Sequence, residues 1–174
     1  MSSYELRRAT PADAEAIART MELGFDGYRE FAPKRWIPPE VSAEGFRTRL
    51  EDDAVWCQVG LADGEMAGHV AFMPAALHGT WPDEGNPLLG HFWQLFVREP
   101  HWGTGLARAL HANALEAAEE RGFETVRLYS AEAQLRARAF YEREGWRQSG
   151  EPFLEESFGM PLVEYRVSLP RRTR

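Results

Sequence analysis

The chain has only one cysteine, Cys57, among its 174 residues. No disulfide can therefore form within the chain, which is compatible with a reducing compartment. Cys57 lies in the apolar run AVWCQVGL, and we interpret it as a buried structural thiol rather than a nucleophile.

Long apolar segments are also missing. No stretch approaches 18 apolar residues, so we expect no transmembrane helix and no membrane partner. The N-terminal segment MSSYELRRATPADA has no apolar core of a signal peptide. We therefore expect the protein in the cytoplasm.

Basic residues are fewer than acidic residues. Lys plus Arg number 20 and Asp plus Glu number 27, which gives a net charge of −7. This balance argues against a nucleic-acid partner, because nucleic-acid-binding domains usually carry a basic stripe. With 44% hydrophobic and 27% charged residues, the composition is typical of one soluble globular domain.

Several chemical signatures are absent as well. No G-x-S-x-G elbow of a serine hydrolase is found. His69 and His78 have no partner at ligand spacing, so we expect no metal. We interpret His101 and His111 as surface residues.

Hydrophobic periodicity predicts an α+β fold. Antiparallel strands come first and β-α-β-α units follow, which favours a mixed sheet over a doubly wound one. The expected strands cover 4–8, 54–61, 65–73, 91–97, 124–130, 146–149 and 161–169. The expected helices run from 10 to 24, from 42 onward, from 103 to 122 and from 132 to 145, and residues 77–90 read as a loop.

Local signals mark the ends of these elements. Thr10 and Asp13 form a T-x-x-D capping box, and Gly24 is the expected end of the first helix. Val41 and Phe46 flank the second helix start as a hydrophobic staple. The pair Asp63-Gly64 predicts a hairpin turn, and Gly122 is the expected C-terminal cap of the helix from 103.

The segment VREPHWGTGLA joins a strong strand to a helix. Gly103 and Gly105 allow a tight turn whose backbone N–H groups converge at a helix N-terminus, where a phosphate or pyrophosphate binds well. A plain strand-to-helix turn is the alternative. No Lys follows as in a P-loop, and Arg108 occupies the third glycine position of a Rossmann fingerprint.

Two motifs together resemble those of the GNAT superfamily of acetyl-CoA-dependent N-acyltransferases. WGTGLA at 102–107 is similar to the family's [QR]-x-x-G-x-[GA], and QLRARAFYEREGW at 134–146 is similar to its N-x-x-A-x-x-F-Y-x-x-x-G-[FW]. Trp102 replaces the usual Arg or Gln, which removes a side-chain donor near the pyrophosphate. Gln134 replaces the usual Asn.

The resemblance implies one GNAT-like acetyltransferase domain over residues 1–174, with frayed ends at 1–3 and 170–174. It implies a mixed, mostly antiparallel sheet of about seven strands and about four helices, with splayed central strands. It also implies acetyl-CoA as co-substrate and no metal. The cofactor-binding residues it implies are Leu95, Phe96, Val97, Gly103, Thr104, Gly105, Leu106, Ala107, Arg108 and Gln134, the Leu95 N–H also polarising the thioester carbonyl.

Tyr141 and His91 are the catalytic residues that the resemblance implies. Tyr141 matches the tyrosine that assists departure of the thiolate, although a core aromatic is the alternative. His91, or a water chain, would take the proton of the amine. His91 and Trp93 share one strand face with Leu95 and Val97 if no bulge intervenes.

The implied reaction is direct transfer of an acetyl group to a primary amine within a ternary complex. A non-catalytic acyl-CoA-binding or regulatory module of the same fold is the alternative. Phe25, Tyr28 and Trp93 are candidate acceptor-binding residues, and a small-molecule amine is favoured over a protein acceptor. A homodimer through the final strands is a family-level expectation.

Overall fold

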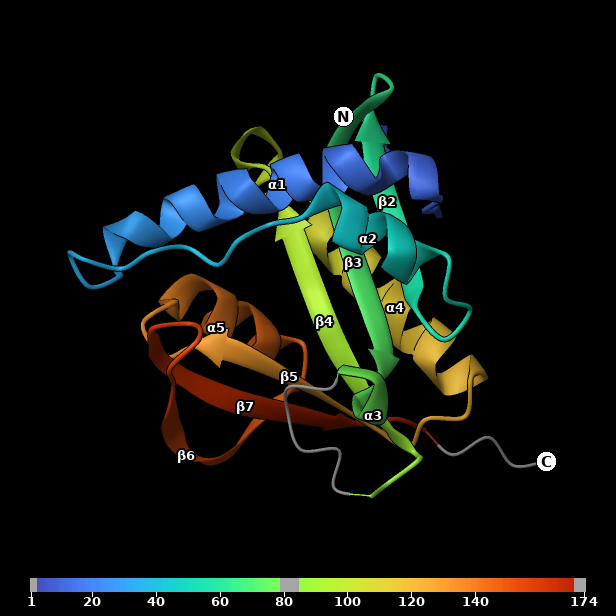
Figure 1. The fold of residues 1–174 in the computed structure, drawn as a ribbon. Coiled ribbons are helices and arrows are strands. Elements are labelled where there is room, and N and C mark those ends of the chain that lie inside the picture. The colour runs from blue at the N-terminus through green and yellow to red at the C-terminus, as the bar shows by residue number, and fades with distance from the viewer. Residues whose placement is uncertain (1–2, 79–84, 171–174) are drawn as a thin grey trace.

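A single seven-stranded sheet carries the fold, in the order β1-β2-β3-β4-β5-β7-β6 (Figure 1). The computed structural model describes residues 3–78 and 85–170. Residues 79–84 of the loop expected at 77–90 lie outside the described residues. So do residues 1–2 and 171–174 of the expected frayed ends. The strands are β1 (Glu5–Arg8), β2 (Trp56–Ala62), β3 (Glu65–Pro74), β4 (Leu89–Val97), β5 (Thr125–Ala131), β6 (Arg147–Glu155) and β7 (Met160–Ser168).

Helices cover both faces of this sheet. They are α1 (Ala14–Gly27), α2 (Ala43–Leu50), α3 (Ala75–His78), α4 (Leu106–Glu120) and α5 (Leu135–Arg143). Helices α1 and α2 pack on one face, around Ile17, Phe46 and Val59. Helices α4 and α5 pack on the other face, around Leu110 and Tyr141, and Figure 1 shows the two layers. The α+β, mostly antiparallel architecture is confirmed.

Within residues 3–78 and 85–170, β4 and β5 are the only parallel neighbours, and they separate after three residue pairs. Their ladder runs from Leu89–Thr125 to His91–Arg127. Beyond it the two strands diverge into a V, visible in Figure 1 as the gap between the arrowheads of β4 and β5. The expected splaying of the central strands is thus present.

A β-bulge in β4 changes which side chains share a face. Ala71 pairs with Gln94 and Phe72 with Phe92, so Trp93 is the extra residue. Trp93 packs on the α2 side with Phe46, at a ring distance of 5.4 Å. Because a bulge shifts the alternation by one residue, Leu95 packs on the α4 side. His91, Trp93, Leu95 and Val97 were expected to share one face only in a strand without a bulge, and because the bulge is present they do not.

The expected capping signals occur, with one correction. The Asp13 carboxylate accepts the Thr10 N–H at 2.8 Å, and Val41 and Phe46 share one apolar cluster. Helix α1, however, continues past Gly24 to Gly27. Gly24 does not adopt a positive φ, so it has no reason to end the helix.

Gly24 instead allows close packing of α1 on β4. A Cβ at this position would lie 2.3 Å from the Phe96 ring. We expect Gly24→Ala to destabilise the fold by about 1–3 kcal/mol, because the overpacking outweighs the gain in helix propensity. Urea unfolding measures this, with Gly27→Ala as control, since a Cβ there meets nothing within 4 Å. A stabilised Gly24→Ala variant would contradict the close packing.

The remaining differences from expectation concern short elements. The Asp63-Gly64 turn is confirmed, with φ values of 51° and 81°, and Gly122 ends α4 with φ 87°. Helix α3 at Ala75–His78 was not expected, and β6 is longer than the predicted strand at 146–149. Among the described residues no helix has the length and apolar character needed to cross a membrane.

Candidate active site

The open edge of β4 lines one side of the V. The Arg98 N–H donates to Ala67 O on β3 at 2.8 Å. Since pairing in an antiparallel ladder alternates, Val97 and Leu95 direct their backbone groups away from β3 and into the V. Phe96 directs its backbone groups toward His69 on β3. Strand β4 thus offers unpaired backbone donors and acceptors where a further strand would pair.

The amino end of α4 lies next to this edge. Gly103 and Gly105 have φ values of 73° and 89°, and a Cβ on either would meet nothing within 4 Å. Ala109 makes the first intrahelical bond, to Gly105 O at 3.0 Å. The N–H groups of Ala107 and Arg108 therefore have no helical acceptor, and the Leu106 N–H has only a long contact, 3.5 Å, with Thr104 Oγ1. Such a helix start fits an anion such as a pyrophosphate.

Side chains hold this turn in place. The Tyr4 hydroxyl lies 3.0 Å from His101 Nδ1 and 3.0 Å from Thr104 Oγ1. The Thr104 hydroxyl donates to His101 O at 2.7 Å. Thr104 therefore stabilises the loop, and its hydroxyl is already engaged in the absence of any ligand.

Trp102 and Gln134 occupy the two positions that differ from the motifs. The Trp102 Nε1–H donates to Val97 O at 2.7 Å, so one acceptor of the β4 edge is covered. Gln134 is the N-cap of α5 and makes no side-chain capping bond. Arg108 is 77% exposed at its side chain and pairs with Glu144 at 3.4 Å.

Tyr141 lies in the apolar cluster on the α4 side of the sheet. It is 8% exposed and packs against Phe92, Phe140 and Trp146, with ring distances of 5.4–6.3 Å. Burial raises the pKa of Tyr141 above its ordinary value, with a smaller contribution from Tyr28. The phenol therefore stays protonated at neutral pH.

Tyr28 lies in the aromatic cluster that follows α1. Burial raises the pKa of Tyr28 to about 12. Tyr28 also stacks on Trp36 at 5.7 Å. A predicted acceptor residue is thus held in place by aromatic packing.

His91 lies at the closed end of the V, in the last residue pair of the β4–β5 ladder. It is 3% exposed, and its ring lies 4.4 Å from that of His78. Burial lowers its pKa well below the ordinary value. Leu95 follows His91 by four positions, which corresponds to a distance of about 13 Å along the strand. This placement argues against direct proton abstraction by His91 and leaves the water chain.

Aromatic residues form the wall of the V on the α1 side. Phe25 comes from the last turn of α1, Tyr28, Phe31 and Trp36 come from the segment after it, and Phe158 comes from the β6–β7 turn. The Trp36 Nε1–H donates to Phe158 O at 2.6 Å. Phe158 has no sequence signal, because its contact joins residues 122 positions apart. Of the predicted acceptor residues, Phe25 and Tyr28 belong to this wall, whereas Trp93 packs under α2.

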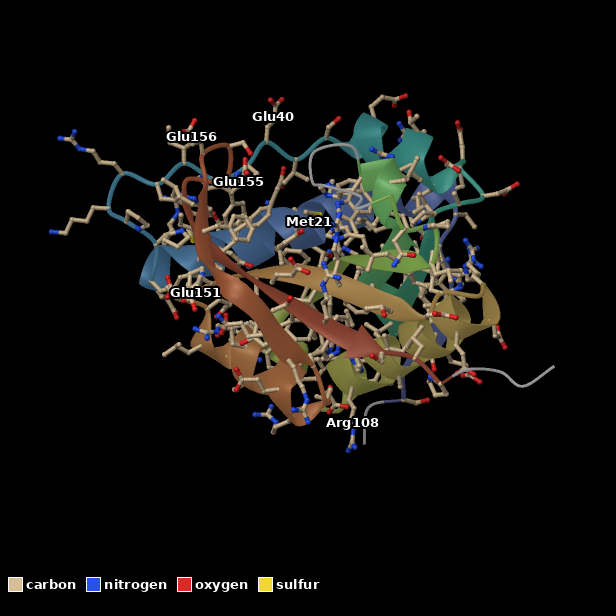
Figure 2. All side chains as sticks on the ribbon, turned by 90° about the horizontal axis from the view of Figure 1, so that it is seen from below. Met21, Glu40, Arg108, Glu151, Glu155 and Glu156 are labelled. Carbon is tan, nitrogen blue, oxygen red and sulfur yellow. The ribbon has the colours of Figure 1, made fainter. Side chains whose placement is uncertain are left out.

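An open cavity of about 270 Å³ borders this wall. Its lining comes from the segment after α1, the β5–α5 connection and the start of β7: Phe31, Pro33, Glu132, Ala133, Met160 and Pro161. In Figure 2, Glu40, Glu155 and Glu156 lie toward one edge of the molecule, whereas Arg108 lies toward the opposite edge.

His111 corrects one expectation. It is 3% exposed, and its Nε2 accepts the Trp146 indole N–H at 2.8 Å. His111 is therefore a buried packing residue between α4 and the start of β6. Cys57 is buried as expected, and burial raises its pKa to about 12, which argues against a nucleophilic thiolate. No group of three His, Cys, Asp or Glu residues suited to a metal ion occurs in residues 3–78 and 85–170.

A buried polar pair braces the bulged part of β4. His69 Nε2 lies 2.9 Å from Gln94 Oε1, and the His69 ring stacks on Phe96 at 5.8 Å. Burial lowers the pKa of His69 to about 4, below the ordinary 6.5. The folded state therefore disfavours the charged imidazolium.

This pKa shift gives a stability prediction. Above pH 6.5 His69 is neutral in both states and its contribution is complete. As pH falls from 6.5 to 4, only the unfolded chain binds the proton, so the free energy of unfolding falls, by about 3 kcal/mol from this group. Urea unfolding at pH 7.5, 6 and 5 measures the loss. His69→Gln should show a shallower slope, and an unchanged slope would contradict a neutral buried His69.

The comparisons with known proteins agree with this geometry. The sequence profile of the Acetyltransferase (GNAT) family matches residues 21–146. The chain is 28% identical to the aminoalkylphosphonate N-acetyltransferase of Salmonella typhimurium over 157 residues, covering 86% of this chain and 88% of that protein. It is 30% identical to N-acetyltransferase family 8 member 2 of Rattus norvegicus over 109 residues, 61% of this chain and about half (48%) of that protein.

A solved acetyltransferase structure shares the fold. The PaiA N-acetyltransferase of Thermoplasma acidophilum, solved in complex with coenzyme A, superposes with a TM-score of 0.76 at 14% identity. The match covers 95% of this chain and 99% of that one. The family profile, the splayed β4–β5 pair and the glycine turn before α4 lead to the same conclusion: the chain belongs to the GNAT acetyltransferase family.

Proposed function

We propose that the protein is an N-acetyltransferase that moves the acetyl group of acetyl-CoA to the primary amine of a small molecule. The observation that carries the proposal is the open β4 edge at Leu95 and the Val97 N–H, next to the N–H groups of Ala107 and Arg108, which have no helical acceptor. An extended chain with amides at one end and phosphates at the other fits these two features.

The residues of the chain divide the binding between them. The pantetheine arm would pair with the backbone groups of Leu95 and with the N–H of Val97, as an added strand does, because Trp102 already covers the Val97 carbonyl. The phosphates would bind at the turn of Gly103 and Gly105 and the first turn of α4. Gln134, at the start of α5, is a side-chain amide for the same arm. Acetyl-CoA supplies an acetyl thioester that is reactive toward amines.

Two groups act on the reacting atoms. The Leu95 N–H, on the open edge, is a donor for the acetyl carbonyl oxygen, and a preorganised donor favours the developing negative charge. The Tyr141 hydroxyl, neutral because burial raises its pKa, protonates the thiolate sulfur as the C–S bond breaks, and it regains a proton through water from the nitrogen that has formed the C–N bond. The proton of the attacking ammonium leaves through water, since His91 lies at the closed end of the V.

The acceptor binds on the α1 side of the V. Aromatic side chains line this wall, and aromatic faces favour a small cation over an anion. The names of the two sequence relatives, both N-acetyltransferases, support an amine acceptor.

Calorimetric titration of the protein with acetyl-CoA tests the cofactor part, with ATP and NAD as controls. Selective micromolar binding is the expected result, and release of free thiol on adding amines then identifies the acceptor. Equal binding of all three nucleotides, or none, would withdraw the proposal. Binding without thiol release for any amine would favour an acyl-CoA-binding module.

A further inference from the structure

An arginine from α5 lies over the indole of Trp102. The Arg136 guanidinium carbon is 3.4 Å from the centroid of the Trp102 ring. Trp102 is 48% exposed and is anchored from below by its hydrogen bond to Val97 O. The contact therefore joins the first turn of α5 to the loop before α4, which are the two elements that border the cofactor site proposed above.

The guanidinium of Arg136 interacts with the neutral Trp102 ring rather than with a carboxylate. Within the part of the chain that the structure describes, no carboxylate lies within 4.0 Å of its guanidinium. Arg108, by contrast, pairs with Glu144 at 3.4 Å. Glu99 influences Arg136 only at longer range, and partial burial lowers the pKa of Arg136 from 12.5. A cation–π contact at an exposed site is weak, and it leaves the N–H donors at the edge of the guanidinium free.

A phosphate is the ligand that suits such a group. The planar guanidinium donates two parallel hydrogen bonds to phosphate oxygens, which an ammonium cannot do. Stacking on Trp102 limits the positions of the long side chain before the ligand arrives, so less conformational entropy is lost on binding. The turn at 102–107 contributes backbone donors but has Trp102 where a charged or amide side chain is usual in the motif.

We propose that Arg136 binds a phosphate group of coenzyme A and that Trp102 holds it ready at the mouth of the site. The cation that the 102–107 motif lacks is thus supplied by α5. This inference rests on the proposed function, because it takes coenzyme A as the ligand. Arg136 is a binding residue for the cofactor, and the chemistry at Tyr141 does not involve it.

The test is a calorimetric titration of wild type, Arg136→Ala and Arg143→Ala. Arg143 is the matched control, because it is exposed on the same helix and lies two turns further along, on the same face. The probes are acetyl-CoA, 3′-dephospho-CoA and S-acetylpantetheine, which has no phosphate beyond its thioester arm. Thermal unfolding of each variant checks that the fold is unchanged, as expected for an exposed side chain.

We expect Arg136→Ala to weaken acetyl-CoA binding by about 30-fold, the range for a lost charge-assisted hydrogen-bond pair. Arg143→Ala should stay within twofold of wild type, and S-acetylpantetheine should bind all three proteins equally. If the loss disappears with 3′-dephospho-CoA, the 3′-phosphate is the partner of Arg136. If it persists, the pyrophosphate is the partner.

A second substitution examines Trp102. Trp102→Phe keeps an aromatic face for Arg136 and removes the hydrogen bond to Val97 O, so acetyl-CoA should bind within threefold of wild type. Trp102→Ala removes the stacking surface and should weaken binding of acetyl-CoA but not of S-acetylpantetheine. Equal losses for both probes would mean that Trp102 acts on the pantetheine arm instead.

Two outcomes overturn the inference. If wild type binds acetyl-CoA selectively and Arg136→Ala binds it equally well, the inference fails and the proposed function stands. If wild type does not bind acetyl-CoA at all, both fail together. The affinity of wild type for acetyl-CoA, compared with its affinities for ATP and NAD, therefore separates the two failures.

Discussion

Tyr141→Phe is expected to lower kcat by about 100-fold while the affinity for acetyl-CoA changes less than twofold. The substitution removes only the hydroxyl, and loss of a positioned general acid costs about this much or more. The ring packing against Phe92 and Trp146 is preserved, so the fold and the cofactor groove are retained. Steady-state thiol release and calorimetry measure the two quantities separately.

The matched control is Tyr165→Phe. Tyr165 is another buried tyrosine of the same apolar cluster, but its hydroxyl donates to Glu142 at 2.7 Å, away from the V. That variant should lose stability and keep its kcat. If Tyr141→Phe loses cofactor binding instead of turnover, Tyr141 is a binding residue. If neither quantity changes, its catalytic assignment is wrong.

Gly105→Val is expected to reduce acetyl-CoA affinity by more than about 100-fold. Gly105 has φ 89°, a conformation that a β-branched residue almost never adopts. The turn must therefore rearrange, and the N–H groups of 106–108 then no longer converge on a phosphate. Calorimetry measures the affinity.

Gly122→Val provides the control for this experiment at the other end of the same helix. Gly122 has φ 87°, and a Cβ there also meets nothing within 4 Å. The two variants should therefore have a similar backbone strain energy, of about 1–2 kcal/mol. Only the Gly105 variant should lose cofactor affinity. Equal affinities would show that the turn before α4 does not bind the cofactor.

Much of the fold could be predicted from spacing within the chain. Runs of β-forming residues around the Asp63-Gly64 turn predict β2 and β3, and residues at helical spacing predict α1 and α4. The αL glycines at the ends of α4 and at Gly145 follow from local chain geometry. The candidate cofactor site could be proposed for the same reason, because its backbone groups lie in one continuous segment from Leu95 to Arg108.

The side-chain environment of the site could not be read in this way. One extra residue at Trp93 reverses the face of every side chain after it, and no local pattern marks the bulge. His111 lies at a polar position of the α4 pattern, yet it is buried because the Trp146 indole supplies a donor from 35 residues away. His91 has a suitable ordinary pKa, but its place in the ladder buries it at the closed end of the V.

The sequence by itself determined the order of the seven strands and of the four longer helices, the glycine turn before α4 and the two motifs of the GNAT family, because each depends on neighbouring residues. Only the tertiary structure decided what faces the V. It brought Phe158 onto Trp36 and Arg136 over Trp102. These contacts join segments that are distant in the chain, and their formation depends on how the helices and strands pack rather than on any local spacing.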